Sequence, residues 1–290
     1  MAPHEQHGLP LGQGPRPADG DELAAALRSA ATRIDPSITG LDEVRVVARM
    51  RGADIELVDA DLTGLVVGPG AVAVRPGGDA GAAVPIRSAV PAVLHDLRIA
   101  GHPISVLGAA VDLDARVTGL PVDWIERGDG EVELLPRLDR GAPAGAAVLL
   151  ADPDELGPAI TTALETILAD ARLRVDGISV LVTGLDDAMA AGGAVAVEAT
   201  ATARLGFVRA PVRARAAVRA DGGLRLAVED VELTSTNVLA STALGAARGT
   251  IDRAIGDGID LRRWLPAALH GASIRIGVVD GRLRLAAELP

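Results

Sequence analysis

Histidine is a residue type that could carry acid–base or metal chemistry in this chain. His95 is followed directly by Asp96, and His102 lies seven residues after His95. An imidazole beside a carboxylate can act as an acid–base pair, and two imidazoles can ligate a metal ion. Two histidines at this spacing supply too few ligands for a metal site and too few partners for a catalytic one. We therefore predict no metal site and no catalytic residue here.

Cys and Lys are missing altogether, and their absence excludes several kinds of chemistry. The chain has no Cys, and all 28 of its basic residues are Arg. A phosphate-loop lysine, a Schiff-base lysine, a thiol nucleophile and a cysteine metal site are therefore excluded. The glycine-rich run over 68–81 has no G-x-G-x-x-G pattern and is predicted to be a loop. We predict a protein that is not an enzyme and needs no cofactor.

A row of arginines could bind an anionic group. Arg209, Arg213, Arg215 and Arg219 follow one another at close spacing, and guanidinium groups pair well with phosphate. The alternative is a solvated sheet face on which these arginines pair with Asp and Glu, and this is the interpretation that we favour.

The segment around Trp264 is the second candidate for contact with a headgroup or a membrane. Trp264 follows Arg262 and Arg263 and precedes Leu265 and Pro266. A tryptophan beside arginine can anchor a protein at a lipid interface, with its ring below the charged headgroups. The alternative, which we favour, is a tryptophan that packs a loop onto the core.

Charge and composition restrict the partners. Thirty-nine acidic residues against 28 arginines give a net charge of −11. This balance argues against nucleic acid as a partner and disfavours purely electrostatic docking on an anionic bilayer, although a local arginine patch stays open. Hydrophobic residues make up 49% of the chain and aromatic residues only 1%, so its interior must be aliphatic.

The N-terminal residues 1–20 have the composition of a disordered tail, rich in Pro, Gly and Gln. They contain no hydrophobic run of the kind found in a secretory signal. No segment approaches the ~20 apolar residues that a membrane-spanning helix requires. We expect a cytoplasmic protein, with peripheral membrane association left open.

Helices are predicted over 21–33, 90–97, 154–171 and 238–256. The first begins with two acidic residues, which suit the positive end of a helix, and places Leu23 and Leu27 on one face. In the second, Pro91 suits the first turn of a helix. The last carries an apolar stripe of Leu244, Ile251 and Ile255.

Strands dominate the rest of the chain. Strict alternation of apolar and polar residues predicts strands over 109–118, 195–205 and 212–218. The apolar phase slips near Glu229, which predicts a β-bulge there. The chain closes in a predicted hairpin over 274–289 that turns at Asp280-Gly281.

These elements predict an α+β fold. Long alternating strands in antiparallel order give a twisted and strongly curved sheet with one aliphatic face, and two main helices would cover that face. The order of helix and strands occurs twice, so residues 21–290 could be one unit built from pseudo-repeats over 21–150 and 151–290. If the helices fill the concave face, the protein has a plain core; if they fill it in part, an apolar groove remains.

The C-terminal third resembles the LmeA-like family of actinobacterial phospholipid-binding proteins. The resemblance is carried by the stretch Asp221–Leu226, the helix after it, Trp264-Leu265-Pro266 and the closing hairpin of Ile274–Leu289. The run Val148-Leu149-Leu150 into Glu155-Leu156 is similar to that family's mid-chain entry from strand to helix, while residues 40–125 fit only as alternating strands. The resemblance implies a TULIP-like fold, in which a curved sheet wraps around a helix and holds a lipid.

The function predicted from these arguments is non-catalytic binding or transfer of a phospholipid or similar amphiphile in an aliphatic groove. The alternative is a structural or protein-interaction module with a filled core and no ligand. The partner would be a lipid or other apolar small molecule, with peripheral membrane contact as an option and no nucleic acid. The predicted ligand-lining residues are Val111, Leu113, Val117, Trp124, Val195, Val197, Leu244, Ile251 and Ile255, and the predicted headgroup or membrane contacts are Arg262, Arg263 and Trp264.

Overall fold

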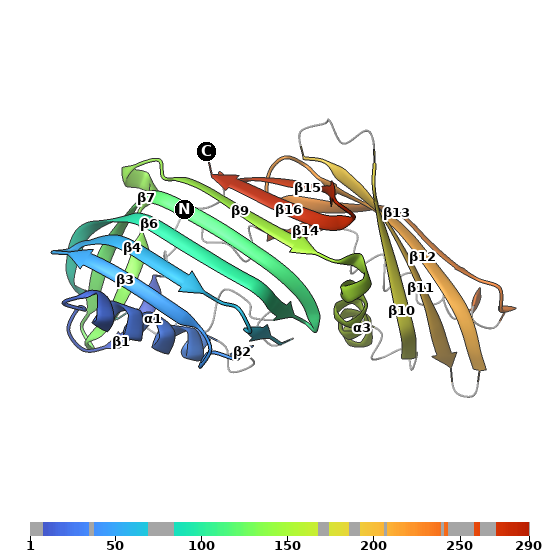
Figure 1. The fold of residues 1–290 in the computed structure, drawn as a ribbon, viewed down its shortest axis with the longest axis horizontal. Helices are drawn as coiled ribbons and strands as arrows, with labels where there is room; N and C mark the ends of the chain where they lie inside the picture. The colour runs from blue at the N-terminus through green and yellow to red at the C-terminus, as the bar shows by residue number, and fades with distance from the viewer. Residues whose placement is uncertain are drawn as a thin grey trace.

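The structure of the protein is a computed structural model that describes residues 8–34, 38–68, 84–167, 174–185, 192–205, 208–238, 241–242, 258–261 and 271–289. The described residues form two β-sheets and a few helices, which confirms the predicted α+β class (Figure 1). The helices are α1 (Gly20–Ile34), the 3-10 helices η1 (Leu138–Arg140) and η2 (Pro153–Glu155), and α3 (Leu156–Ile167).

The first sheet holds most of the strands. Its strands lie in the order β15-β16-β9-β7-β6-β4-β3, with β8 and β1 continuing from β7, and β5 and β2 from β6. Their bounds are β1 (Leu9–Gln13), β2 (Ile38–Thr39), β3 (Arg45–Arg51), β4 (Asp54–Asp61), β5 (Val66–Val67), β6 (Ile86–Val106), β7 (Ala109–Arg127), β8 (Glu131–Pro136), β9 (Ala144–Ala151), β15 (Ser273–Val279) and β16 (Arg282–Leu289).

The first sheet is mixed, whereas the sequence predicted antiparallel order alone. β4 and β5 both pair with β6 in parallel. A tight turn can join only antiparallel neighbours, but the chain after β4 is long enough to return and enter β6 in the same direction. Alternation of side chains carries no information on strand direction, so this pairing was not predictable from it.

The second sheet is antiparallel throughout and has the order β10-β11-β12-β13-β14. The predicted slip near Glu229 is confirmed: the pairing of β12 with β13 shifts between Arg215 and Ala217, and Asp230 has a φ of +53°. This bulge returns Val231 and Leu233 to the apolar side of the sheet. The strands are β10 (Arg174–Gly184), β11 (Ala194–Leu205), β12 (Val208–Ala220), β13 (Arg225–Ser235) and β14 (Ile259–Asp260).

α1 confirms the predicted first helix and covers the inner face of the first sheet. The Asp19 side chain accepts a hydrogen bond from the Glu22 N–H (2.9 Å), and the Glu22 carboxylate accepts one from the Ala18 N–H (2.8 Å). These two bonds cap the start of the helix. The helix buries Leu23 and Ala30 against the sheet.

The predicted disordered tail over 1–20 contains a strand. Leu9–Gln13 form β1, which pairs antiparallel with β8, and Leu11 is buried. The prediction weighed overall composition, whereas the free edge of β8 offers hydrogen-bond partners to a short apolar stretch. Residues 1–7 lie outside the described part of the chain.

The predicted helix over 90–97 is wrong. These residues lie within β6, which pairs with β7 along almost its whole length. β4 begins to pair with β6 at Leu94, three residues after Pro91. At Pro91, β6 therefore pairs with β7 on one side and not with β4 on the other. Proline is tolerated where a strand lacks a second neighbour.

The predicted helix over 154–171 is confirmed where the structure describes it. η2 and α3 run from Pro153 to Ile167, and the Asp152 carboxylate accepts a hydrogen bond from the Asp154 N–H (3.0 Å) at their start. No helix in the described ranges is both long enough and apolar enough to cross a bilayer. Most of the predicted helix over 238–256 lies outside those ranges.

The C-terminal hairpin joins the two sheets. β16 pairs with β9 in the first sheet, and β15 forms the edge next to the second sheet. The Ile274 N–H donates to the Gly223 carbonyl (3.1 Å), and the Ile276 N–H donates to the Gly192 carbonyl (2.8 Å). Because residues 273–289 belong to the first sheet, the predicted pseudo-repeats over 21–150 and 151–290 do not coincide with the two sheets.

Candidate functional site

The aliphatic face of the second sheet is the candidate site. Cross-strand pairing places Val195 opposite Val218, Val197 opposite Ala216, and Ala199 opposite Ala214. β10 and β13 extend these rows with more apolar residues. The rows that pairing defines across the sheet are Val195–Val218–Val228, Val182–Val197–Ala216, Val180–Ala199–Ala214–Leu233 and Ala201–Val212.

One half of this face is part of a core that we call the junction cluster. Val195 is 0% exposed, and Ile274 of β15 is 2% exposed. α3 and β16 contribute further apolar side chains, so the half nearest the hairpin is filled. The buried members of the junction cluster are Val180, Val182, Val195, Ala220, Leu224, Leu226, Ala272, Ile274 and Ile276.

The other half of the face, which we call the open half, lies farther from the hairpin. Its residues are partly exposed. None of them belongs to the buried clusters formed by the described residues. The open half consists of Ala199, Ala201, Val212, Ala214, Val231 and Leu233, so its side chains are all aliphatic and mostly short.

The opposite face of the second sheet carries its charges in ion pairs. Glu198 lies 3.0 Å from the Arg213 guanidinium and 2.9 Å from that of Arg215, and Arg219 lies 3.5 Å from Glu229. The interpretation of the arginine row as a solvated, paired sheet face is therefore confirmed for Arg213, Arg215 and Arg219, whereas Arg209 is exposed and the interpretation stays a prediction for it. These pairs are exposed, so each adds little to stability.

The predicted ligand-lining residues lie in separate clusters. Val111 is buried beside Val44, Leu65, Ile104 and Ala151, and Leu113 packs against this middle cluster. Val195 and Val197 belong to the junction cluster. Leu156 of α3 and Leu283 of β16 touch both clusters and connect them.

Two other predicted lining residues lie apart from the second sheet. Trp124 is 2% exposed in the cluster beneath α1, and its Nε1 donates to the Ala53 carbonyl (2.8 Å). Val117 pairs with Gly145 of β9, a position that also adjoins Leu289. Among the described residues, the predicted lining residues are therefore divided between separate clusters.

The remaining predicted site residues lie outside the described part of the chain. They are Leu244, Ile251 and Ile255 on the predicted covering helix, and Arg262, Arg263 and Trp264. Their roles stay predictions.

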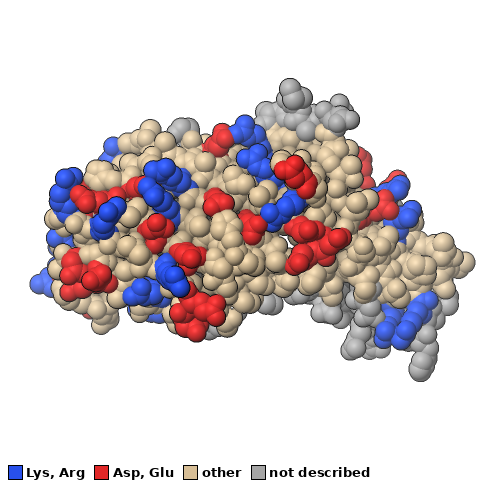
Figure 2. All heavy atoms as spheres, viewed as in Figure 1, with Lys and Arg blue, Asp and Glu red and all other residues tan. Residues whose placement is uncertain are grey.

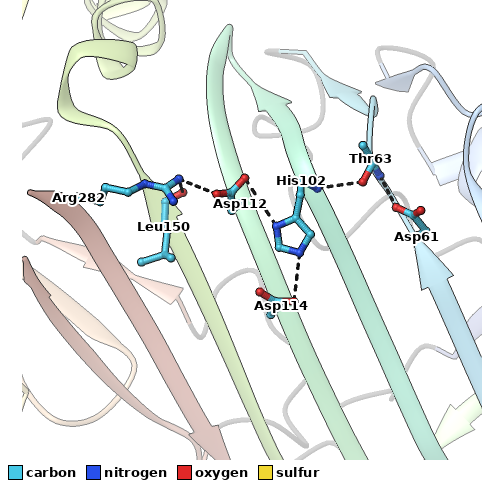
Figure 3. Close-up of polar contacts among 7 residues, drawn as sticks. All are labelled: Asp61, Thr63, His102, Asp112, Asp114, Leu150 and Arg282. Atoms are coloured by element: carbon cyan, nitrogen blue, oxygen red, sulfur yellow. Dashed lines mark hydrogen bonds and ion pairs between the residues drawn. The ribbon is translucent and has the colours of Figure 1, made fainter. Parts of the chain in front are cut away.

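Figure 3 shows a polar network around His102 on the outer face of the first sheet. His102 Nε2 lies 3.2 Å from Asp114 Oδ1, and its Nδ1 lies 3.7 Å from Asp112 Oδ1. The second oxygen of Asp112 accepts a hydrogen bond from Arg282 (2.7 Å). The backbone N–H of His102 donates to the Thr63 hydroxyl (3.0 Å). The network thus links the outer face of β7 to the C-terminal hairpin.

The described residues around His102 are not arranged as a metal site, and Asp96 has two arginines as partners. No group of acidic or imidazole side chains in the described ranges is arranged to hold a metal ion. The Asp96 carboxylate instead binds Arg98 (2.6 Å) and Arg116 (3.0 Å). Hydrogen bonds from Arg98 and then Arg116 lower the pKa of Asp96, so it stays ionised as an ion-pair partner.

No protein-family model matches the chain, and neither a curated protein nor a solved structure is significantly similar to it. The functional argument therefore rests on the geometry of the second sheet.

The site residues that sequence reasoning missed are those of the open half. The alternation over 195–205 places Ala199 and Ala201 in the same apolar row as Val195 and Val197. The sequence did contain a signal for these residues, because the apolar row over 195–205 is longer than one short hairpin can cover.

Proposed function

We propose that this protein binds the acyl chain of a phospholipid or similar amphiphile, without catalysis, on the open half of the second sheet. One observation carries the proposal: an aliphatic sheet face continues from the filled junction cluster into six partly exposed residues. An apolar surface next to a packed core is where a hydrophobic ligand gains most from leaving water.

The side chains of the open half suit a flexible chain as ligand. Three of the six residues are alanines, so short side chains lie between the larger ones of Val212 and Leu233. A methylene chain lying on such a surface gains about 0.8 kcal/mol for each CH₂ that it buries. Such a ligand needs no polar partner along its chain. The resemblance of the C-terminal third to phospholipid-binding proteins supports the same class of ligand.

Native mass spectrometry of the freshly purified full chain, followed by solvent extraction and lipid identification, tests the proposal. We expect lipid at a near-stoichiometric amount, or uptake of a fluorescent fatty acid by delipidated protein. A protein that stays free of lipid after incubation with mixed phospholipids contradicts the proposal. That result favours the alternative, a structural or interaction module with a filled core.

A matched pair of variants locates the ligand. Leu233→Glu places a carboxylate on the open half, whereas Thr234→Glu places the same group on the adjacent, exposed position of β13. Burying an unpaired carboxylate against an acyl chain is costly, so Leu233→Glu should lose at least tenfold in fatty-acid affinity. Thr234→Glu should bind like the unmodified protein. Equal affinities for both variants would place the ligand elsewhere.

A further inference from the structure

His102 of β6 faces two carboxylates of the neighbouring strand β7 (Figure 3). Its Nε2 is 3.2 Å from Asp114 Oδ1, and its Nδ1 is 3.7 Å from Asp112 Oδ1. A charged imidazole donates from both ring nitrogens, whereas a neutral one donates from only one of them. Two carboxylate oxygens, one facing each ring nitrogen, therefore match the charged form of His102 better than the neutral form.

The end of β4 adds a third carboxylate on the other side of β6. The backbone N–H of His102 donates to the Thr63 hydroxyl (3.0 Å). Asp61 is the last residue of β4, and hydrogen bonds from Thr63 lower its pKa. The charges of Arg45 and His102 lower the pKa of Asp61 further. The imidazole thus lies among acidic groups from both strands that pair with β6.

Arg282 brings the C-terminal hairpin into this network. It donates to the second oxygen of Asp112 (2.7 Å), so Asp112 links His102 to β16. Val111, the residue before Asp112, is buried in the middle cluster. Leu283, the residue after Arg282, packs against both the middle cluster and the junction cluster. The polar network therefore lies on the outer side of strands whose inner side connects the two sheets.

We propose that His102 is a proton-dependent clasp, which holds the ends of β4, β6 and β7 and, through Asp112, the C-terminal hairpin more firmly in mild acid than above neutral pH. Imidazole changes charge between about pH 5 and 8, and its cation attracts the surrounding carboxylates. This contribution is present in mild acid and is lost as rising pH removes the proton. Below about pH 4 the carboxylates take up protons, and the attraction is lost again.

The clasp acts on local opening rather than on global unfolding. The His102 side chain is 48% exposed and that of Asp114 is 67% exposed, and ion pairs of this exposure are weak. Transient opening of one end of a sheet responds to such weak interactions even where the rest of the fold does not. We expect this end of the first sheet to open about two to five times less often in mild acid than above neutral pH.

Hydrogen exchange of the full chain tests the clasp, with rates at about pH 5.5 and about pH 7.5 corrected for the intrinsic effect of pH on exchange. Amides of the paired segments 104–106 and 109–113 should be about two- to fivefold better protected at the lower pH. His102→Gln keeps a side chain that forms hydrogen bonds but cannot become charged, so it should remove this difference. Added salt should also weaken the difference.

His95→Gln is the matched control. His95 lies on the same strand and is exposed, and it has no ion-pair partner among the residues that the structure describes. This variant should keep the full pH difference. An equal loss in His95→Gln and His102→Gln would contradict the proposal, as would a pH difference that persists in His102→Gln.

Asp114→Asn tests the clasp from the side of its carboxylates. Asp114 is exposed, so the variant should fold even if His102→Gln does not. It removes the charge nearest to His102 and should reduce the pH difference to less than about twofold. An unchanged difference in Asp114→Asn, or the absence of any difference in the unmodified protein, would overturn the proposal.

Discussion

The two sheets are built from the same alternation of apolar and polar residues, yet their apolar faces are covered to different extents. On the first sheet, α1 covers the inner face, and both Leu23 and Ile55 are fully buried. On the second sheet, the C-terminal hairpin and α3 cover one half, and the open half stays partly exposed. Alternation therefore predicts that a strand has an apolar face, but the element that packs on it decides between a core and a binding surface.

The charged faces of the two sheets, in contrast, are alike. Over the first sheet, acidic and basic side chains are intermixed (Figure 2), and Asp96 binds both Arg98 and Arg116. On the second sheet, Glu198 binds both Arg213 and Arg215. The difference between the sheets thus lies in how their apolar faces are covered.

The junction between the sheets gives the largest expected effect. Gly193 has a φ of +82°, and a Cβ at this position would lie 2.1 Å from the Ile276 carbonyl oxygen. Gly193→Ala must therefore displace β15 as well as strain the backbone, and we expect it to lower the free energy of unfolding by about 3 to 5 kcal/mol. Urea denaturation measures this loss.

Gly177→Ala is the control for backbone strain alone. Gly177 has a φ of +62°, and a Cβ there would meet nothing within 4 Å. Its expected cost is about 1 kcal/mol. If both variants lose the same stability, contact between the second sheet and β15 does not hold the two sheets together.

Truncating one leucine on each sheet compares the two apolar faces directly. Leu23→Ala leaves a cavity beneath α1 and should cost about 3 kcal/mol. Leu233→Ala on the open half removes a partly exposed side chain and should cost less than about 1 kcal/mol. The urea midpoints of the two lipid-free variants, compared with that of the unmodified protein, measure these two costs. An equal cost for both would mean that the open half is packed as a core, which would contradict the proposed binding surface.

The local elements could be largely predicted from the sequence. The acidic start of α1, the alternation of β11 and the slip at Asp230 are all determined by residues close together in the chain. The errors arose where distant segments decide the structure. β6 became a strand along its whole length because β7 pairs with it, and Leu9–Gln13 joined the sheet because β8 offers a free edge.

The candidate site was less predictable than the fold. Val111 and Val195 both lie in strands with alternating apolar and polar residues, but Val111 packs in a cluster with Val44 and Leu65, and Val195 packs in one with Ile274 of β15. Which strand faces which cover depends on the arrangement of the two sheets, and no local pattern encodes it. Trp124 was among the predicted lining residues, whereas it is buried in the cluster beneath α1 and donates a hydrogen bond to the Ala53 carbonyl.

A buried carboxylate of the first sheet gives an intermediate effect. Asp123 is 1% exposed and lies 2.6 Å from Arg137 Nη1 and 2.5 Å from Arg140 Nη1. Asp123→Asn removes the charge that both guanidinium groups face and should cost about 2 kcal/mol, because one partner of a buried ion pair is lost. Asp139→Asn removes an exposed carboxylate from the same Arg137 and should cost less than about 1 kcal/mol. Thermal denaturation of the two variants tests the difference; a reversed order would show that burial does not set the strength of this pair.

The smallest expected effect is the dependence of stability on acid, and it should arise in the first sheet and its connections. Hydrogen bonds from Arg98 and Arg116 lower the pKa of Asp96, and a hydrogen bond from Arg137 lowers the pKa of Asp139. A carboxyl group whose pKa is lower in the folded state stabilises the fold above its unfolded pKa, and this contribution is lost as pH falls through the folded pKa.

We therefore expect urea midpoints that hold steady near neutral pH and fall below about pH 4, where carboxylates take up protons. Asp96→Asn should flatten part of that fall, because its side chain no longer titrates. Both carboxylates are exposed, so added salt should also weaken the dependence. Hydrogen exchange locates the effect: amides of β6 and β7 should lose protection in acid before those of β11 and β12. The opposite order would mean that the paired charges of the first sheet do not control its response to pH, and that the second sheet, with its partly exposed face, is the part that acid opens first.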